Sequence, residues 1–444
     1  MPKLLKKGII LDPRAYFQEE KDILINEEKI IKIADSIEVN ELREKYDSSF
    51  LDKLEIFELE KNFVLPGLID LHTHLREPGY EEKETIRTGC EAAAAGGFTQ
   101  IACMANTKPV ADNPATIEFI KSQSRKAAVK VWPVGSITKD MQGENLAEIG
   151  FLSKAGVKAI SDDGKTVMDS DIMRRAMEYA AGFNMLVIDH CEDLNLVGEG
   201  VMNEGYYSTI LGLKPIPAAA EEVIIARNII LSELTDCPIH IAHLSTARGV
   251  EMVAEAKEKG ISITAETTPH HLILTDKAVV GYDPNTRVNP PLRSSEDREA
   301  LRQGIKEGII DAVATDHAPH TFEDKLGEFD QAANGISGLD TSLSLLYDRL
   351  VDENILNWSE LLEAMVYKPA EILKLQEPGI REGKTADLAV FDPDKKWKIE
   401  SKALKSKGKN TPFLGEELKG KVKMTLLDGK LVYDNRGGQN EIIY

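Results

Sequence analysis

The sequence predicts an α/β protein whose main part is a (β/α)8 barrel and whose two ends together form a small β-rich domain. Three observations lead to this prediction. Short apolar runs alternate with helical stretches through the middle of the chain, both ends consist of strand-like runs, and polar residues follow most of the central runs. Strands that alternate with helices form parallel sheets, and the loops after barrel strands carry the active site.

The beginning of the chain is predicted to form strands rather than helices. Short apolar runs such as Gly8 to Leu11 alternate with charged turns, which is typical of small strands. From about Thr385 the same pattern returns, with a turn signal at Asp428-Gly429. Since chain ends commonly lie close together, we expect residues 1–61 and 374–444 to form one small domain.

Residues 62–373 are predicted to form the barrel. Eight strand-like runs occur here, at Phe63 to Leu71, Phe98 to Cys103, Val131 to Val134, Val157 to Ile160, Met185 to Ile188, Pro238 to Ala242, Ile261 to Thr264 and Ile310 to Ala314. Eight strands favour a barrel over an open, doubly wound sheet. The open sheet would need a glycine-rich phosphate loop after its first strand, and no such loop is present there.

Composition and charge narrow the function classes. The 444 residues are 42% hydrophobic and 29% charged, as in ordinary globular proteins with a sizeable core. The formal net charge of -20 and the pI near 5.0 argue against a general affinity for nucleic acid or an anionic membrane. A small anionic substrate stays possible, because a local cation such as Arg76 can decide binding inside a pocket.

The cysteines and the N-terminus indicate a cytoplasmic protein. The four cysteines Cys90, Cys103, Cys191 and Cys237 have no CxxC spacing, which fits reduced thiols packed in a core better than a disulfide framework. The first apolar run stops at Asp12, too early for a signal peptide or a membrane span.

Side chains suited to metal binding follow the predicted strands. The first run ends in His72-x-His74, whose imidazoles would point to the same side of a strand. Arg76 also follows the first run, and further polar residues follow later runs: Asn106, Asp162, Asp163, His190, His243, Asp316 and His320. A single histidine at a strand end is more often structural than a ligand, and Asp162-Asp163-Gly164 alone is an ordinary turn. The recurrence at one end of the barrel favours the metal-site interpretation.

Imidazole and carboxylate suit divalent ions of the Zn, Mn or Fe type. Four histidines and two aspartates exceed what one tetrahedral zinc ion needs, so we predict two such ions, with Zn²⁺ as the first choice. We assign His72, His74 and Asp316 to one ion and His190 and His243 to the other, with Asp163 as the bridge. The remaining histidines are assigned structural roles: His240, His270, His271 and His317.

Several motifs resemble those of the class I dihydroorotases of the amidohydrolase superfamily. They are HLREPG at 74–79, ANTKP at 105–109, SDDG at 161–164, HLS at 243–245, PHHL at 269–272, NPPLR at 289–293 and TDHAPH at 315–320. The resemblance spans nearly the whole chain. It implies a metal-binding barrel with a small β-sandwich domain. It also implies reversible interconversion of L-dihydroorotate and N-carbamoyl-L-aspartate in pyrimidine biosynthesis.

The resemblance also implies roles for individual residues. The six assigned ligands fall on the family's metal positions, and Asp316 would act as the catalytic acid and base. The positions implied for substrate binding are His74, Arg76, Asn106, Asn289, His320, Asn334 and Gly335. Asn334 stands where the family pattern has an aromatic residue, so this loop lacks that apolar side chain. Many relatives bridge their ions with a carboxylated lysine, so Lys158 is an alternative bridge, although SDDG favours Asp163.

Two other functions compete with this interpretation. A cyclic amidase for hydantoins or allantoin would share the metals, but Arg76 and His320 argue against it. The second alternative is a catalytically silent scaffold subunit. Such a protein could lose its metal ligands, but every expected ligand position is occupied in this sequence. The resemblance makes a homodimer plausible. The polar segment 320–328 is predicted to be a mobile flap over the site.

Overall fold

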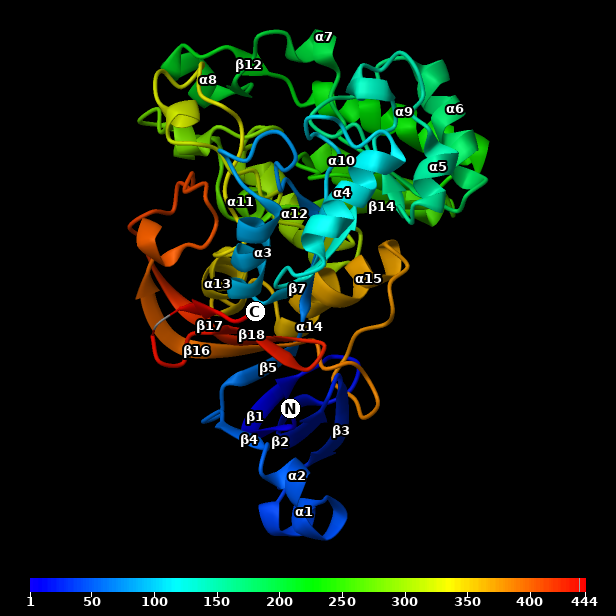
Figure 1. Cartoon of the computed structure of the whole chain (residues 1–444). Coiled ribbons are helices and arrows are strands. Elements are labelled where there is room, and N and C mark those ends of the chain that lie inside the picture. The colour runs from blue at the N-terminus through cyan, green and yellow to red at the C-terminus, as the bar shows by residue number, and fades with distance from the viewer. Residues whose placement is uncertain (439) are drawn as a thin grey trace.

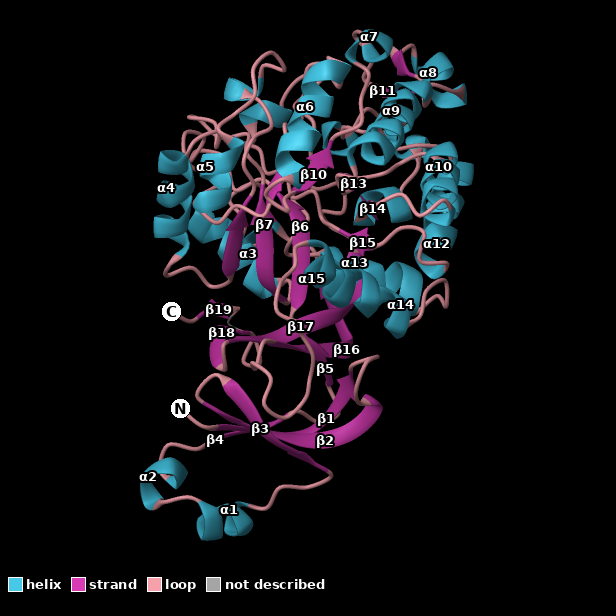
Figure 2. Cartoon of the chain, turned by 90° about the vertical axis from the view of Figure 1, so that its right-hand side faces the viewer, coloured by secondary structure: helices cyan, strands magenta, loops and turns pink. Residues whose placement is uncertain are grey.

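The computed structural model describes residues 1–438 and 440–444 as a mixed α/β fold (Figure 1). Helices and parallel strands make up one part of the molecule, and a β-rich part that holds both chain termini lies against it (Figures 1 and 2). The helix pair α1 (Val39–Lys45) and α2 (Ser48–Leu51) lies at the far end of the β-rich part. In the described residues, no helix has both the length and the apolar character to cross a membrane.

A nine-stranded sheet draws its strands from both ends of the chain. Its order is β19-β18-β17-β16-β5-β1-β2-β3, with β4 paired to β1. The strands are β1 (Lys3–Leu11), β2 (Phe17–Asn26), β3 (Lys29–Ala34), β4 (Glu55–Glu58), β5 (Phe63–Pro66), β16 (Leu388–Lys398), β17 (Glu417–Leu427), β18 (Lys430–Asp434) and β19 (Glu441–Ile442). The antiparallel pair Val64 and Val390 joins the two ends, and their buried side chains belong to one apolar core.

The other main strands are parallel and form two sheets. A three-stranded sheet contains β6 (Leu68–Thr73), β7 (Phe98–Cys103) and β8 (Lys130–Pro133). A five-stranded sheet contains β9 (Ala159–Ile160), β10 (Leu186–Asp189), β13 (Ile239–Ile241), β14 (Ile263–Thr267) and β15 (Ala312–Val313). Isolated parallel bridges between Gly135 and Ile160 and between Thr73 and His317 connect the edges of the two sheets. A short pair, β11 (Met202–Asn203) and β12 (Pro215–Ile216), lies outside them.

Each of the eight predicted runs overlaps one of these parallel strands, but the first run is divided. Its beginning forms β5 in the nine-stranded sheet and its end forms β6, with Gly67 between them. A Cβ atom at Gly67 would lie 2.3 Å from the Thr99 side chain. Glycine therefore allows the chain to pass close to β7 as it leaves one sheet for the other.

Helices follow the parallel strands and pack against them. They are α3 (Ile86–Ala95), α4 (Pro114–Ser124), α5 (Ile149–Lys154), α6 (Ser170–Ala181), α7 (Leu194–Val197), α8 (Tyr206–Leu211), α9 (Ala219–Thr235), α10 (Ala247–Glu258), α11 (Pro269–Ile273), α12 (Ser295–Lys306), α13 (Ser342–Leu346), α14 (Trp358–Leu362) and α15 (Lys368–Ile372). Side chains cap several N-termini, as Asn113, Asp169 and Ser294 do. The apolar faces of these helices belong to the largest core cluster. Polar residues follow the carboxyl ends of the strands.

Candidate active site

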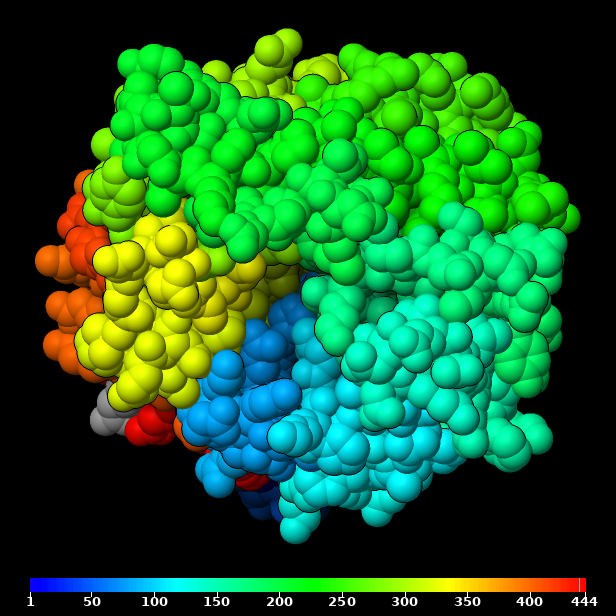
Figure 3. Space-filling model, turned by 90° about the horizontal axis from the view of Figure 1, so that it is seen from above, coloured from blue at the N-terminus to red at the C-terminus, as the bar shows by residue number. Residues whose placement is uncertain are grey.

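A pocket of about 210 Å³ is lined by residues that follow the parallel strands. The lining residues are His74, Arg76, Asn106, Asp163, Gly164, His190, His243, Asn289, Asp316, Ala318, His320, Asn334 and Gly335. Seen from above, the molecule has a hollow near its centre, where segments of distant parts of the chain meet (Figure 3). Of the predicted site residues, His72 alone is not among the lining residues, because it lies fully buried beside the pocket.

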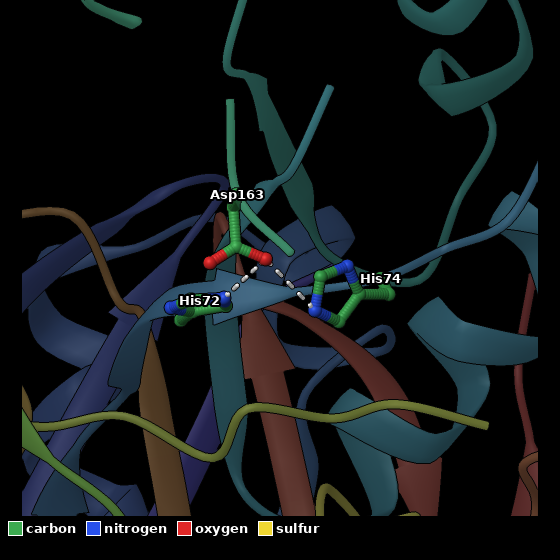
Figure 4. Close-up of side chains that lie close together, drawn as sticks. All are labelled: His72, His74 and Asp163. Atoms are coloured by element: carbon green, nitrogen blue, oxygen red, sulfur yellow. Dashed lines mark ion pairs between the residues drawn. The ribbon is translucent and has the colours of Figure 1, made fainter. Parts of the chain in front are cut away.

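The first group of potential metal ligands consists of His72, His74 and Asp163. His72 lies within β6 and His74 just beyond its end, so the two imidazoles approach the same carboxylate (Figure 4). The Oδ2 atom of Asp163 is 3.3 Å from His72 Nε2 and 3.4 Å from His74 Nε2. Two imidazoles and one carboxylate are a donor set that suits a divalent transition metal ion or zinc.

The second group consists of Asp163, His190 and His243. His190 and His243 each follow a strand, β10 and β13, and their atoms Nδ1 and Nε2 lie 2.8 Å apart. The other oxygen of Asp163, Oδ1, is 3.4 Å from His243 Nε2 and 3.8 Å from His190 Nδ1. Asp163 thus belongs to both groups and presents one oxygen to each.

Asp316 lies beside the first group. Its Oδ1 atom is 3.2 Å from His74 Nε2 and 3.7 Å from His72 Nε2. Burial opposes the charged form of Asp316, but His74 and the neighbouring imidazoles outweigh this effect and hold its pKa below the usual range. Asp316 is therefore ionised at neutral pH.

The residues present fit a metal ion. His72 Nε2 and Asp163 Oδ1 are buried and have no hydrogen-bond partner in the described part of the chain, and leaving such polar atoms unpaired is costly. Both atoms belong to the groups described above and are donor atoms of the kind that metals bind. A bound cation would satisfy them, so the His/Asp groups could hold metal.

The charges of these groups depend on one another. Burial opposes ionisation of Asp163, yet His72, His243 and His74 lower its pKa well below the usual value. Burial likewise disfavours the imidazolium of His72, but Asp163 and Glu266 raise its pKa well above the usual value. A metal ion bound here would become the largest local charge and would replace these protons.

Glu266 supports His72 from behind. His72 Nδ1 donates to Glu266 Oε1 at 2.8 Å, which leaves Nε2 directed toward Asp163. The other carboxylate oxygen lies 3.2 Å from His240 Nε2, and His240 Nδ1 bonds the hydroxyl of Thr264 at 2.8 Å. Carboxylates that hold the second nitrogen of a metal-binding imidazole orient the ring. Sequence reasoning missed Glu266, although it stands near the carboxyl end of β14 and follows the same strand-end pattern.

Glu192 is a second residue that sequence reasoning missed. Its Oε2 atom is 3.3 Å from His190 Nε2, and Asn289 Nδ2 lies 3.3 Å from the same nitrogen. Burial opposes the charged form of His190, but Glu192 and Asp163 raise its pKa to about 9. The spacing His190-x-Glu192 was the available signal, since residues two apart in extended chain share a face.

Further polar side chains line the same pocket. Arg76 Nη2 lies 3.4 Å from His320 Nε2, and Arg76 Nε donates to the backbone oxygen of Pro319 at 3.2 Å. Asn106 Oδ1 lies 2.9 Å from His74 Nδ1. Burial and the nearby Arg76 lower the pKa of His320 to about 3, so its imidazole is neutral at pH 7.

The loop with Asn334 and Gly335 closes this side of the pocket. His320 Nε2 lies 2.8 Å from the backbone oxygen of Asn334, while the Asn334 side chain accepts from Arg287 Nε at 3.0 Å. Gly335 has a φ of +134°, and a Cβ there would lie 2.6 Å from Ala318 Cβ. Only glycine fits this close approach.

Three site residues have a left-handed backbone conformation. The φ angles are 63° for Arg76, 34° for His243 and 45° for Asp316. Such values cost non-glycine residues on the order of 1 kcal/mol or more and concentrate at functional sites. The surrounding fold therefore holds these side chains in directions that an unstrained backbone would not give.

The remaining predicted residues make their hydrogen bonds outside the two His/Asp groups. His317 Nε2 pairs with Glu84 Oε2 at 3.3 Å, and His271 Nε2 donates to the backbone oxygen of Pro290 at 3.1 Å. Burial lowers the pKa of His270 to about 4. Lys158 Nζ donates to the backbone oxygen of Lys374 at 3.2 Å and lies over the Trp132 ring, not at Asp163.

Comparison with known proteins agrees with this geometry. A family model described as "Dihydro-orotase-like" matches residues 61–249. The chain is 48% identical over 434 residues to a dihydroorotase of Syntrophus aciditrophicus. The aligned region covers 98% of this chain and 99% of that protein. It is 50% identical over 432 residues to a dihydroorotase of Caldanaerobacter subterraneus subsp. tengcongensis, with 97% of each covered.

Solved structures show the same fold. An L-hydantoinase from Arthrobacter aurescens superimposes with a TM-score of 0.85 at 22% identity, covering 100% of this chain and 97% of that one. A dihydropyrimidinase from Brevibacillus agri superimposes with a TM-score of 0.82 at 24% identity, covering 98% and 96%. Identity near one half over almost the whole length, together with the shared fold, shows that the chain belongs to the dihydroorotase family.

Proposed function

We propose that this chain is a metal-dependent cyclic amide hydrolase that interconverts L-dihydroorotate and N-carbamoyl-L-aspartate in de novo pyrimidine biosynthesis. One observation carries the proposal: two His/Asp groups joined by Asp163 border a single pocket that Arg76 also lines. The first feature suits hydrolysis of a cyclic amide. The second suits a substrate that bears a carboxylate.

The scaffold is proposed to be a closed (β/α)8 barrel at residues 62–373 beside a β-sandwich domain built from residues 1–61 and 374–444. The parallel bridges at both sheet junctions support closure. So does an apolar cluster from several strands, with the small residues Ala102, Ala159 and Ala312, which would fill the interior.

We propose two divalent metal ions, with Zn²⁺ as the expected metal. His72, His74 and Asp316 would hold one ion and His190 and His243 the other, with Asp163 shared. When bound, such ions supply a water of lowered pKa and polarise an amide carbonyl. The shared position of Asp163 supports it as the bridge in preference to Lys158.

Asp316 would carry the proton. Its carboxylate is ionised at neutral pH and lies in the pocket, so its Oδ atoms can take a proton from the attacking water and deliver it to the leaving amide nitrogen. In the direction of ring closure the same oxygens act in the reverse order.

Arg76 would bind the carboxylate of the substrate and so orient the ring. A guanidinium offers two parallel N–H donors to a carboxylate, and Asn106, Asn289 and His320 supply further polar atoms around the same pocket. The neutral imidazole of His320 adds no repulsion against Arg76. The backbone of Asn334 and Gly335 would approach the other side of the ring.

The setting of the enzyme is proposed from residue chemistry. The four cysteines are free and buried, as expected in the cytoplasm, and the substrate is a small molecule. A homodimer stays a prediction.

The first experiment compares two substrates in ring-opening assays. The substitution Arg76→Ala should raise KM for dihydroorotate by about a hundredfold, since a charged hydrogen-bonded pair is lost. KM for an uncharged hydantoin should change little. Arg175→Ala, at an exposed arginine on α6, is the control. Equal losses on both substrates would refute the carboxylate role, and failure of the unaltered protein to open dihydroorotate would refute the function.

The second experiment measures bound metal by elemental analysis. Asp163→Ala should lose most of both ions, because both groups share this carboxylate, whereas His190→Ala should keep about one. Lys158→Met is the matched test of the alternative bridge and should keep both. Loss of metal in Lys158→Met with retention in Asp163→Ala would reverse the assignment.

A further inference from the structure

We propose that Asn410 is a positioning residue for the substrate-binding side of the pocket. Asn410 lies between β16 and β17 of the nine-stranded sheet, far from the site in sequence. Its side chain joins two backbone segments, residues 318–320 and 335–337, that border the pocket. The inference rests on the proposed function for the identity of the substrate, but the contacts themselves do not depend on it.

The Asn410 amide is buried and makes four hydrogen bonds. Its Oδ1 atom accepts from the backbone N–H of His320 at 2.9 Å and from the hydroxyl of Ser337 at 3.0 Å. Its Nδ2 group donates to the backbone oxygens of Ala318 and Gly335, each at 3.0 Å. Both donors and both acceptor sites are therefore used, and they are shared between the two segments.

The two segments carry residues proposed to bind substrate. Residues 318–320 end in His320, and the backbone oxygen of Pro319 accepts from Arg76 Nε at 3.2 Å. Gly335 begins the second segment and touches Ala318 of the first. A shift between the segments would therefore move Arg76, His320 and Gly335 relative to one another.

Gly408 is a second, independent contact of the same kind. A Cβ atom on Gly408 would lie 2.6 Å from Pro319 Cβ and 2.8 Å from the His320 backbone nitrogen. Its φ is outside the left-handed range, so the absence of a side chain serves close packing and not the backbone. The chain of the β-rich part is thus pressed against the Pro319-His320 peptide.

The segment around Asn410, residues 404–410, packs along its length against the part of the molecule that contains the pocket. Leu404, Ser406, Gly408 and Asn410 are buried, while the lysines between them are more accessible. The backbone N–H of Lys407 donates to Glu84 at 3.1 Å, and Glu84 also pairs with His317, the neighbour of Asp316. Such alternation is that of an extended segment with one face against another surface.

The metal-binding residues are held differently. His72, His190 and His243 lie in or just after strands, and none of the four hydrogen bonds of the Asn410 amide reaches them. Loss of the amide should therefore disturb binding of the substrate more than the reacting groups. This predicts a larger change in KM than in kcat, which general destabilisation would not produce.

The kinetic test uses two substitutions and two controls on the metal-loaded full chain. Asn410→Ala and Gly408→Ala should each raise KM for dihydroorotate about tenfold, with kcat lowered less than threefold and metal content unchanged. Asn435→Ala is the first control, because Asn435 is similarly buried in the C-terminal part but bonds Asn440. Gly437→Ala is the second, because its Cβ would meet no atom of the described residues within 4 Å. Both controls should keep the KM of the unaltered protein.

Amide hydrogen exchange supplies a readout that needs no activity. Peptides covering 318–320 and 335–337 should exchange at least about tenfold faster in Asn410→Ala and at the original rate in Asn435→Ala. Failure of the unaltered protein to open dihydroorotate would refute the proposed function. The exchange result would still decide the positioning role, because it needs no activity. Unchanged exchange, or a KM equal to that of the controls in both Asn410→Ala and Gly408→Ala, would overturn the inference.

Discussion

At the scale of single residues, Lys325 shows how the pocket loop is held. Its ammonium is buried and donates to the backbone oxygens of Pro284, Arg287 and Ala333 at 3.1, 3.4 and 2.6 Å. The Ala333 contact ties this lysine to the loop that carries Asn334. Burial, with Arg287 nearby, lowers the pKa of Lys325 to about 7.

This lowered pKa predicts a pH-dependent stability. Between about pH 7 and pH 10 the unfolded chain keeps a proton on Lys325 that the folded chain has released, so folding becomes more favourable as pH rises. Lys325→Met lacks this dependence. The free energy of unfolding of the unaltered protein minus that of the variant should rise by about 2–4 kcal/mol between pH 7 and pH 10.

Urea unfolding at a series of pH values measures that difference. Lys402→Met is the control, because it removes the same charge at an exposed position. Its difference in free energy of unfolding should show no comparable change with pH. A difference between the unaltered protein and Lys325→Met that is constant with pH would contradict the argument.

Residue types at strand ends were predictable, but their supports were not. His72, His74, His190 and His243 could be identified because each follows an apolar run, and the structure brings them together around Asp163. Their roles as ligands stay a prediction. Asn410 could not be found in this way, since it contacts the site from about 90 residues beyond His320 and no local pattern marks such a contact.

At the scale of elements, the first apolar run shows what hydrophobic patterning does not reveal. An unbroken run from Phe63 to Leu71 predicts one strand, but β5 and β6 belong to different sheets. Both are apolar because both are buried, so the pattern alone cannot separate them. The break at Gly67 is decided by tertiary contacts with Thr99 and with Asp387, whose backbone oxygen accepts from the Gly67 N–H at 2.8 Å.

Gly67→Ala should therefore destabilise the protein although the φ angle of Gly67 lies outside the left-handed range. The new methyl group would lie 2.3 to 2.9 Å from Thr99 side-chain atoms, and Thr99 is fully buried and β-branched, so it has little room to move. We expect a loss of about 1–3 kcal/mol in the free energy of unfolding, measured with urea. Gly67→Ala combined with Thr99→Ser should recover part of it, and no recovery would argue against this steric cause.

At the scale of the whole molecule, the order of strands and helices along the chain was easier to predict from the sequence than the contacts between distant segments. The eight apolar runs each overlap a parallel strand, because alternation with helices is a local property. Two other features are long-range contacts: β5 pairs with β16, and the segment 404–411 packs against the part that contains the pocket. Such contacts depend on side-chain fit between distant segments, which a single sequence does not display.

Removal of divalent ions should reveal how far the whole fold depends on the two His/Asp groups. Without cations, buried atoms such as His72 Nε2 and Asp163 Oδ1 have no partner in the described residues. A ligand that binds only the folded state at a hundred times its Kd stabilises that state by about 2.7 kcal/mol per site. Chelation should therefore lower the Tm by several degrees and abolish ring opening, and added Zn²⁺ should restore both.

The substitution Asp163→Ala separates this effect from other actions of the chelator. The variant is expected to bind little metal, so chelation should leave its Tm nearly unchanged, whereas the unaltered protein should show the full shift in differential scanning calorimetry. An equal shift in both proteins would mean that the chelator destabilises the fold elsewhere, because a site that has lost its shared carboxylate has no ions left to release.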